Sequence, residues 1–358
     1  MLTQARIIPA RSHDSKVVSV TARAAVLLFL FALACVPPLR AAQDDNQQVK
    51  AGLEPADWAY ELPAGVTRRE VTYYSDDVPC YATMFYPKGF SPAGKTPGIV
   101  LGQGWAGTHV SIEKYGARLA ERGFVAMVID YRSWGLSDGF VTFKELRKDN
   151  DDSVRFKREK AEVVIKRTRL LPWKQVEDVR NAISYLQGEP GVDRDRIGLW
   201  ASSSAAGNAI VVAAHDARVK AIVSQVPAIF GRRSPKGPYE LRGRMLEDAI
   251  LRARTGQGAE MEAGFSPRRT VDLETSQAVA EYRPFRYLGQ VGKRPVLFIV
   301  AQNEQLFSNE DHAYAASKIL EGPTKVIEIP SITHFEIFSG DAFELSANAA
   351  ADWFRKYL

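Results

Sequence analysis

The sequence predicts an α/β protein with a doubly wound, mostly parallel β-sheet, an N-terminal β-hairpin and a cap insertion. Short, almost wholly apolar runs alternate with segments of helical periodicity from about residue 96 to the end. This alternation is typical of a parallel sheet that helices cover on both faces. The 358 residues, of which 46% are hydrophobic, suffice for one large domain or two small ones with a well-buried core.

A hairpin is predicted ahead of the alternation. In residues 69–87, REVTYYSDDVPCYATMFYP, two β-branched and aromatic runs flank an SDD turn, which predicts two paired strands. TPGIVLGQG (96–104) and FVAMVIDYR (124–132) each predict a buried strand. Between them, IEKYGARLAERG (112–123) has helical spacing and ends in glycine, which predicts the connecting helix.

The second half repeats the pattern. In residues 173–187, apolar side chains recur at Val176, Val179, Ile183 and Leu186, the spacing of an amphipathic helix. Four further strands are predicted in RIGLW (196–200), VKAIVSQVP (219–227), RPVLFIVA (294–301) and KVIEIP (325–330). Two helices are predicted in NAIVVAAHDA (208–217) and AFELSANAAADWFRKYL (342–358). Right-handed crossovers then place the carboxyl ends of all parallel strands on one edge, where such sheets bind ligands.

Two segments interrupt the alternation within the single domain that we predict for residues 43–358. Residues 140–172 are highly charged, and residues 228–290 are long and rich in arginine. Both leave from the carboxyl ends of strands, so both could overhang the ligand edge. We interpret 228–290 as a possible cap or lid, the alternative being an ordinary surface insertion.

Residues 1–42 have the pattern of a secretory signal peptide. Four basic residues precede an apolar run from Ala24 to Val36, and small residues follow at 41–42. The run is shorter than the ~20 apolar residues of a comfortable membrane span. We therefore predict a periplasmic or secreted protein with no stable membrane span after cleavage. A membrane anchor and, through FALAC, a lipoprotein are the alternatives.

The basic charge of the chain belongs largely to this segment. The whole sequence has 47 basic and 42 acidic residues. Residues 1–42 contain five of the basic residues and one of the acidic residues. The remainder is close to neutral, so nucleic-acid binding loses its main support. One of the two cysteines, Cys35, lies in the signal and leaves only Cys80 in the mature chain. No CxxC or HExxH pattern indicates a metal, and we expect no cofactor.

The stretch RIGLWASSSAAG contains the candidate nucleophile. A reactive serine on a strand-to-helix turn needs small residues two positions before and two after it. Trp200 excludes Ser202 on this ground, while Ser203 and Ser204 both have small neighbours. Strand length favours Ser203, because Trp200 is the natural last apolar residue of the strand. A Ser-rich loop before a helix is the alternative interpretation.

A serine nucleophile needs a base. Of the five histidines, His13 lies in the signal and His215 within a predicted helix, while His109 and His312 fall in polar helix-start stretches that favour a solvated role. His334 follows the last predicted strand and is therefore expected on the ligand edge.

The acid that orients the base should follow an earlier strand. Glu304 comes three residues after the strand that ends at Ala301, and we select it. Glu310 and Asp311 stand further along, at a predicted helix start where capping explains them. The order Ser203, Glu304, His334 is the Ser…Asp/Glu…His order of nucleophile-elbow hydrolases.

An oxyanion hole needs two backbone donors. The N–H of Ser204 follows the nucleophile at the start of a helix, where negative charge is favoured. LGQGWAG follows the first central strand, and its glycines permit close backbone approach. The N–H of Trp105 is therefore the predicted second donor; a simple Gly-rich turn is the alternative.

On these residues the chain resembles the α/β-hydrolase superfamily, and within it the dienelactone-hydrolase-like and acetyl-xylan-esterase-like esterases. The resemblance spans residues 69–358 and is carried by GQGWAG, DYRSWGLSDG, QVEDVRNAISYL, GVDRDRIGLWASSSAAGNA, VLFIVAQNEQLF and ITHFEIF. It implies the same nucleophile, acid, base and oxyanion donors as above. Ala201 and Ala205 replace the usual elbow glycines, Gln103 stands where histidine is common, and serine stands where dienelactone hydrolases proper have cysteine.

The sequence thus predicts a serine esterase that cleaves a small-molecule carboxylic ester through an acyl-enzyme, without a nucleic-acid partner. A peptidase or amidase of the same fold is the nearest alternative. A hydrolase fold that has lost catalysis and only binds ligands is the alternative from another class. Oligomeric state and ester specificity have no readable pattern.

Overall fold

The computed structural model describes residues 58–145, 153, 160–233, 237–262 and 270–358. The predicted signal peptide, residues 1–42, lies outside the described residues. Within the described ranges no helix combines the length and apolar character that a bilayer crossing requires.

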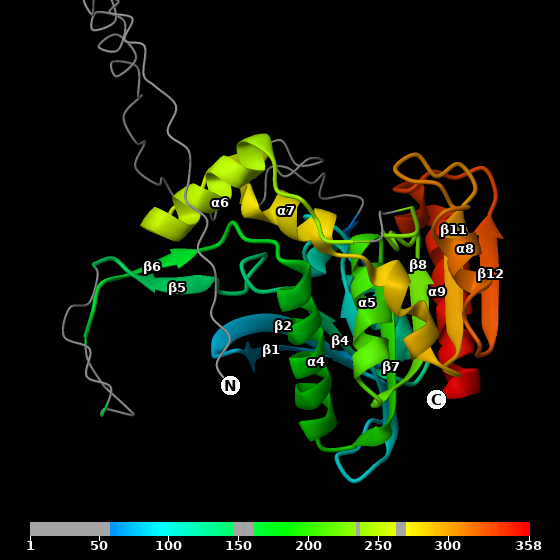
Figure 1. Cartoon of the computed structure of the whole chain (residues 1–358). Helices are drawn as coiled ribbons and strands as arrows, with labels where there is room; N and C mark the ends of the chain where they lie inside the picture. Colours follow the sequence, from blue (N-terminus) through cyan, green and yellow to red (C-terminus); the bar gives the residue numbers. More distant parts are fainter. Residues whose placement is uncertain (1–57, 146–152, 154–159, 234–236, 263–269) are drawn as a thin grey trace, which may run out of the picture. The chain divides into compact units, whose positions relative to one another are not determined.

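A mostly parallel sheet forms the centre of the described chain (Figure 1). Its eight strands lie in the order β1-β2-β4-β3-β7-β8-β11-β12. The antiparallel pairs are β1–β2 and β2–β4, and the other neighbours run parallel. This confirms the predicted fold class. The bounds are β1 Thr67–Ser75, β2 Val78–Tyr86, β3 Thr96–Gly102, β4 Val125–Ile129, β7 Val192–Ser202, β8 Val219–Gln225, β11 Val296–Ala301 and β12 Thr324–Ile329.

The predicted N-terminal hairpin is confirmed, and its turn has a clear physical basis. Asp76 and Asp77 join β1 to β2 with φ of 49° and 62°. Two successive residues at positive φ make the tight turn whose twist matches that of paired strands. Aspartate tolerates this conformation better than most residues.

Helices cover both faces of the sheet. α4 (Pro172–Gly188) and α5 (Ser204–His215) pack on one face, and α3 (Glu113–Glu121) and α9 (Gly340–Tyr357) on the other. Alternate strand residues supply the two cores: Val100 and Leu199 face the first pair of helices, Leu101 and Trp200 the second. Burial on both faces explains why these strands are continuously apolar in sequence.

The two segments outside the alternation contribute elements of their own. Residues 140–172 contain the antiparallel pair β5 (Phe140–Phe143) and β6 (Val163–Lys166). Residues 228–290 contain α6 and α7, which Figure 1 shows beyond the end of α4. That a cap or lid forms here stays a prediction. Between β8 and β11 the elements are α6 Gly243–Thr255, β9 Glu260–Glu262, β10 Thr270–Asp272, α7 Glu274–Glu281 and the 3₁₀ helix η3 Pro284–Val291. After β11 comes α8 Ala313–Ser317.

Candidate active site

The turn between β7 and α5 holds Ser203 in a strained conformation. Ser203 has φ 53° and ψ −123°, a region that residues other than glycine occupy rarely and at a cost. Its N–H donates to Gln225 O at 2.9 Å, and its carbonyl oxygen accepts from Ala206 N at 3.1 Å and Ala228 N at 3.0 Å. The main chain of Ser203 is therefore fixed from three sides.

Small residues surround this turn. Ala201 and Ala205 are both buried. A side chain built on Gly102, in the neighbouring strand β3, would place its Cβ 3.5 Å from Ala205 Cβ and 2.5 Å from the Tyr131 hydroxyl. The close approach at Gly102 is therefore to the Tyr131 hydroxyl, whereas 3.5 Å from the methyl group of Ala205 is an ordinary van der Waals distance.

The loop after β3 packs directly on Ser203. A Cβ on Gly104 would lie 2.7 Å from Ser203 Cβ and 3.3 Å from Ser203 Oγ. Trp105 follows at once, and its side chain packs against Trp134 and Leu170. The backbone that carries the predicted donor at Trp105 thus runs beside Ser203, the candidate nucleophile. Ser204 is the first residue of α5, where backbone N–H groups have no partner within a helix.

Glu304 and His334 form a buried hydrogen-bonded pair. His334 Nδ1 lies 2.7 Å from Glu304 Oε2, and both side chains are no more than 3% exposed. Leu306 N–H donates to the other carboxylate oxygen at 2.9 Å. An ionised carboxylate only accepts, so the imidazole carries its proton on Nδ1 and leaves Nε2 as the basic nitrogen.

Main-chain bonds between neighbouring loops bring the pair together. Gln302 N–H donates to Ile329 O at 3.0 Å, and Asn303 N–H to Ile332 O at 2.9 Å. These bonds join the loop after β11 to the loop after β12. The carboxyl-end loops that carry Glu304 and His334 therefore behave as one unit.

A buried polar network connects the nucleophile turn to the histidine loop. The Gln225 side chain donates to the Tyr115 hydroxyl at 2.8 Å, and that hydroxyl is 3.0 Å from both Ile337 O and Ser346 Oγ. Gln225 also accepts the N–H of Ser203. Ile337 belongs to η4 (Glu336–Phe338), directly after His334. The sequence does not indicate this network, since its members lie far apart in the chain and share no motif.

The alternative acids occupy other roles. Asp311 pairs with Arg232 and with Arg233, the latter at 2.8 Å. No side-chain cap is formed at the start of α8, so the expected capping role of Asp311 is wrong. Glu310 is exposed. The strong attraction of two adjacent guanidinium groups explains why Asp311 turns away from the helix end.

The expected solvated role of His109 and His312 is also wrong, because both are buried. His109 begins η2 (His109–Ser111), and its Nδ1 lies 2.6 Å from Asp130 Oδ2. Burial opposes protonation of His109, but the hydrogen bond and charge of Asp130 raise its pKa. His312 Nδ1 accepts the N–H of Ile229 at 2.7 Å, and burial lowers the His312 pKa. Each histidine is therefore held by a buried hydrogen bond to another segment of the chain.

The arrangement suits nucleophilic chemistry on a carbonyl group. It combines a hydroxyl on a strained turn, a buried imidazole with a defined proton position, and a glycine-bearing backbone loop. Within the ranges that the structure describes, no group of three or more His, Cys, Asp or Glu side chains is placed to hold a metal ion. The Cys80 thiol is buried, which raises its pKa to about 12.

Comparison with known proteins shows what part of the chain is similar to. Residues 82–241 match the model of the dienelactone hydrolase family. The quorum-quenching protein AidA of Acinetobacter baumannii is 26% identical over 321 residues, which cover 81% of this chain and 95% of that protein.

Two solved structures share the fold. The α/β hydrolase GrgF from a Penicillium species superposes with a TM-score of 0.62 at 16% identity and covers 81% of this chain and 99% of its own. An acetyl xylan esterase from a Paenibacillus species superposes with a TM-score of 0.52 at 18% identity, and the match covers 84% of this chain and 87% of that chain. At these identities the likeness concerns the fold.

Proposed function

We propose that the chain, of which residues 82–241 match the dienelactone hydrolase family model, is a serine hydrolase of carboxylic esters. The observation that carries the proposal is the buried His334–Glu304 pair, which follows the last two strands on the edge where the Ser203 turn also lies. Esterases among the structural neighbours support ester rather than amide substrates. A peptidase or amidase of the same fold is the second candidate.

In the proposed mechanism Ser203 attacks the acyl carbon of the ester. His334 Nε2 takes the hydroxyl proton while the Oγ–carbon bond forms, and the carbonyl oxygen becomes an oxyanion. Glu304 holds the imidazole in the required tautomer and stabilises the imidazolium. The imidazolium then protonates the leaving oxygen, the ester C–O bond breaks, and the alcohol departs from an acyl-enzyme.

The second half of the reaction uses water in place of the alcohol. His334 removes a proton from water, and the resulting hydroxide attacks the acyl carbon. Collapse of this intermediate releases the carboxylic acid and returns the proton to Ser203. In both halves the N–H groups of Trp105 and Ser204 are proposed to stabilise the oxyanion, a contribution of roughly 3–4 kcal/mol per donor in other hydrolases.

The same proposal includes export and a cap. Residues 1–42 would direct the chain to the periplasm or medium and be removed. Residues 228–290 would cover the ligand edge, because they leave β8 directly beside the nucleophile turn. The substrate is then a small molecule that fits between this segment and the sheet edge.

Replacement of the nucleophile tests the proposal. We expect Ser203→Ala to abolish hydrolysis of p-nitrophenyl butyrate while the far-ultraviolet circular dichroism stays unchanged. Ser184→Ala is the matched control, since Ser184 is exposed on α4 and its hydroxyl donates to Arg180 O. Full activity of Ser203→Ala would reject the assignment.

A fluorophosphonate label distinguishes the enzyme from a protein that only binds ligands. Stoichiometric labelling, with the modified residue located by mass spectrometry, would identify Ser203 and separate it from Ser202 and Ser204. A folded sample that takes up no label would instead favour the non-catalytic alternative.

A further inference from the structure

An aromatic cluster, formed by the rings of Phe230, Phe307 and His312, adjoins the imidazole of His334. The Phe307 ring contacts that imidazole with centroids 5.3 Å apart and planes at 84°, an edge-to-face arrangement. Within the cluster, Phe307 contacts His312 at 5.0 Å. Phe230 contacts Phe307 at 6.3 Å and His312 at 5.4 Å. The three rings thus contact one another pairwise, and one of them contacts the proposed base.

The cluster is connected to both partners of the proposed reaction. Phe230 follows β8, Phe307 follows β11 and His334 follows β12, so all three lie beyond the carboxyl ends of parallel strands. Ala228 N–H donates to Ser203 O at 3.0 Å, and Phe230 stands two residues further along the chain. The cluster is therefore joined to the Ser203 turn through the main chain and to His334 through ring contact.

Part of the cluster faces outward although its main chain is held. Phe230 is 38% exposed in spite of its two ring contacts, and Phe307 is partly exposed. Ile229 N–H donates to His312 Nδ1 at 2.7 Å. The carbonyl oxygen of Phe230 accepts the N–H of Phe285 at 3.0 Å. Apolar side chains that are exposed together mark binding surfaces, and a surface held in advance costs a ligand less ordering.

The cluster carries no charge at neutral pH. His312 Nδ1 accepts a hydrogen bond and therefore has no proton, so the ring is the neutral imidazole. Burial favours the same state, because it lowers the pKa of His312. The two phenyl rings are apolar. An uncharged ligand group with a flat ring suits this surface, since it can add further edge-to-face or offset contacts.

The chemistry of the proposed reaction indicates which half of an ester meets the cluster. His334 protonates the leaving oxygen, so that oxygen must come within hydrogen-bond distance of the imidazole. The acyl carbon is instead the atom that becomes bonded to Ser203. The alcohol half therefore lies beside the imidazole, which the Phe307 ring contacts.

We propose that the aromatic cluster binds the alcohol half of the substrate, and that the substrate is an ester of an uncharged alcohol bearing an aromatic ring. The ring of the alcohol packs against Phe230 and Phe307 while the ester carbonyl lies at Ser203. This inference rests on the proposed function, since it assigns a substrate class to the same site.

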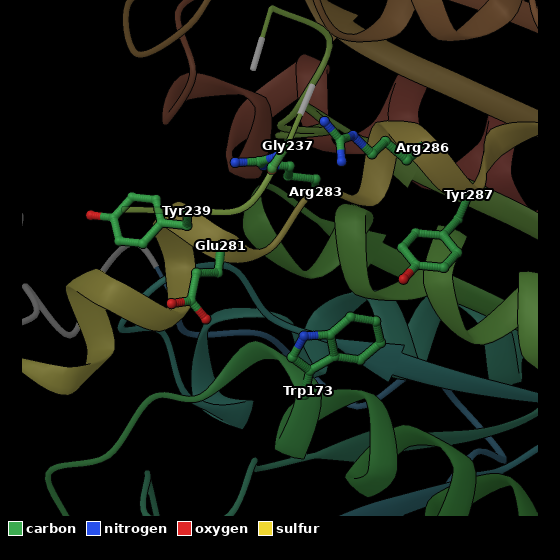
Figure 2. Close-up of a pocket in the computed structure, with 7 residues that line it drawn as sticks. All are labelled: Trp173, Gly237, Tyr239, Glu281, Arg283, Arg286 and Tyr287. Carbon is green, nitrogen blue, oxygen red and sulfur yellow. The ribbon is translucent and has the colours of Figure 1, made fainter. Parts of the chain in front are cut away.

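The competing location for an aromatic group is the pocket shown in Figure 2. It has a volume of about 340 Å³, and Trp173 lines it. The indole lies edge-on to Tyr282 and Tyr287, with centroids 5.2 and 5.9 Å apart. Neither Phe230 nor Phe307 lines this pocket, so substitutions can tell the two locations apart.

Two esters with the same reacting bond test the substrate class on the full chain. 2-Phenylethyl acetate and 2-cyclohexylethyl acetate differ only in the ring, which two methylene groups separate from the ester oxygen. Their chemical reactivity is therefore alike, and the cyclohexyl ring is at least as apolar. We expect kcat/KM to be about fivefold higher for the phenyl ester because of its ring contacts. Ser203→Ala should hydrolyse neither ester.

Substitutions locate the ring through the ratio of the two kcat/KM values, in which general damage to catalysis cancels. Phe230→Ala and Phe307→Leu should each lower the ratio below about twofold. Trp173→Ala is the matched control and should keep the ratio of the parent protein, since Trp173 is an exposed aromatic residue outside the cluster. A ratio that falls in Trp173→Ala but not in the cluster variants would place the aromatic group in the pocket of Figure 2 and overturn the proposal.

Moving the ring across the ester bond tests the assignment to the alcohol half. Ethyl 3-phenylpropanoate and ethyl 3-cyclohexylpropanoate carry the same two rings on the acyl half, and Phe230→Ala should leave their ratio unchanged. If it lowers that ratio, the cluster binds the acyl group and the assignment is wrong. Equal Ser203-dependent hydrolysis of the two acetates rejects this inference and leaves the proposed function standing. Hydrolysis of none of the esters rejects both.

Discussion

Gly104 is the position at which the geometry makes its sharpest prediction. A methyl group there would lie 2.7 Å from Ser203 Cβ, whereas carbon atoms in favourable contact are about 3.5–4.0 Å apart. The shortfall is about 1 Å. Ser203 cannot retreat easily, because its N–H and its carbonyl oxygen are bonded to Gln225, Ala206 and Ala228. In Gly104→Ala either the loop with its proposed oxyanion donor or the hydroxyl must move.

A displacement of about 1 Å at a reacting centre costs on the order of 100-fold in rate, which corresponds to ~2.7 kcal/mol in activation free energy. Overpacking of this kind also destabilises a fold by about 1–3 kcal/mol. We therefore expect kcat of Gly104→Ala on p-nitrophenyl butyrate to fall by roughly 100-fold. A cooperative thermal transition should persist at a lower Tm.

The matched control is Gly188→Ala at the end of α4, where an added Cβ meets no atom within 4 Å. This variant should keep the activity and Tm of the parent protein. If Gly104→Ala also kept its activity within threefold of the control, the loop after β3 would not position the reaction, and the oxyanion assignment would be wrong.

Three further predictions concern buried polar side chains. Glu304→Gln should lower kcat by about 10³- to 10⁴-fold, because the amide no longer selects the Nδ1–H tautomer of His334; an unchanged pH–rate profile would contradict this. Tyr115→Phe should cost about 1–3 kcal/mol in urea unfolding, since it leaves buried partners without a bond, and should lower kcat more than it raises KM. The His312 pKa is lowered from 6.5 in the folded state, so the unfolded chain binds the extra proton and stability falls as pH drops below about 6.5. His312→Gln should lose less stability between pH 7.5 and 5.5, and an equal loss in both proteins would refute the effect.

Local patterns account for what the sequence predicts well. The strand ending near Trp200 and the turn at Ser203 depend on an apolar run, small flanking residues and a following helix, all within a dozen positions. Alternation of such units determines a parallel sheet, and a parallel sheet places its carboxyl ends on one edge. The same rule selects Glu304 and His334 as candidates, and the structure places the two side chains in contact across 30 positions of sequence.

Contacts between distant segments account for what the sequence does not show. The bond between Gln225 and Tyr115 spans 110 positions, and neither residue belongs to a motif. Asp311 stands at a helix start, where capping is the ordinary role, yet arginines at 232 and 233 attract it more strongly. A polar helix-start context suggests exposure for His312, but packing of the neighbouring loop buries it. Each of these outcomes depends on which elements meet in three dimensions.

The alanines at the nucleophile turn show why a motif should be judged together with the strand beside it. Small residues are usual at these positions because the strand-to-helix turn is sharp and strained. Here Ala201 and Ala205 are both buried, and Ser203 still adopts the strained conformation with φ 53°. Even a Cβ built on Gly102, in the neighbouring strand, would lie at an ordinary contact distance of 3.5 Å from the methyl group of Ala205. Departure from the usual elbow glycines is therefore no argument against a reactive Ser203, because the turn and the strand beside it accommodate the alanine methyl groups.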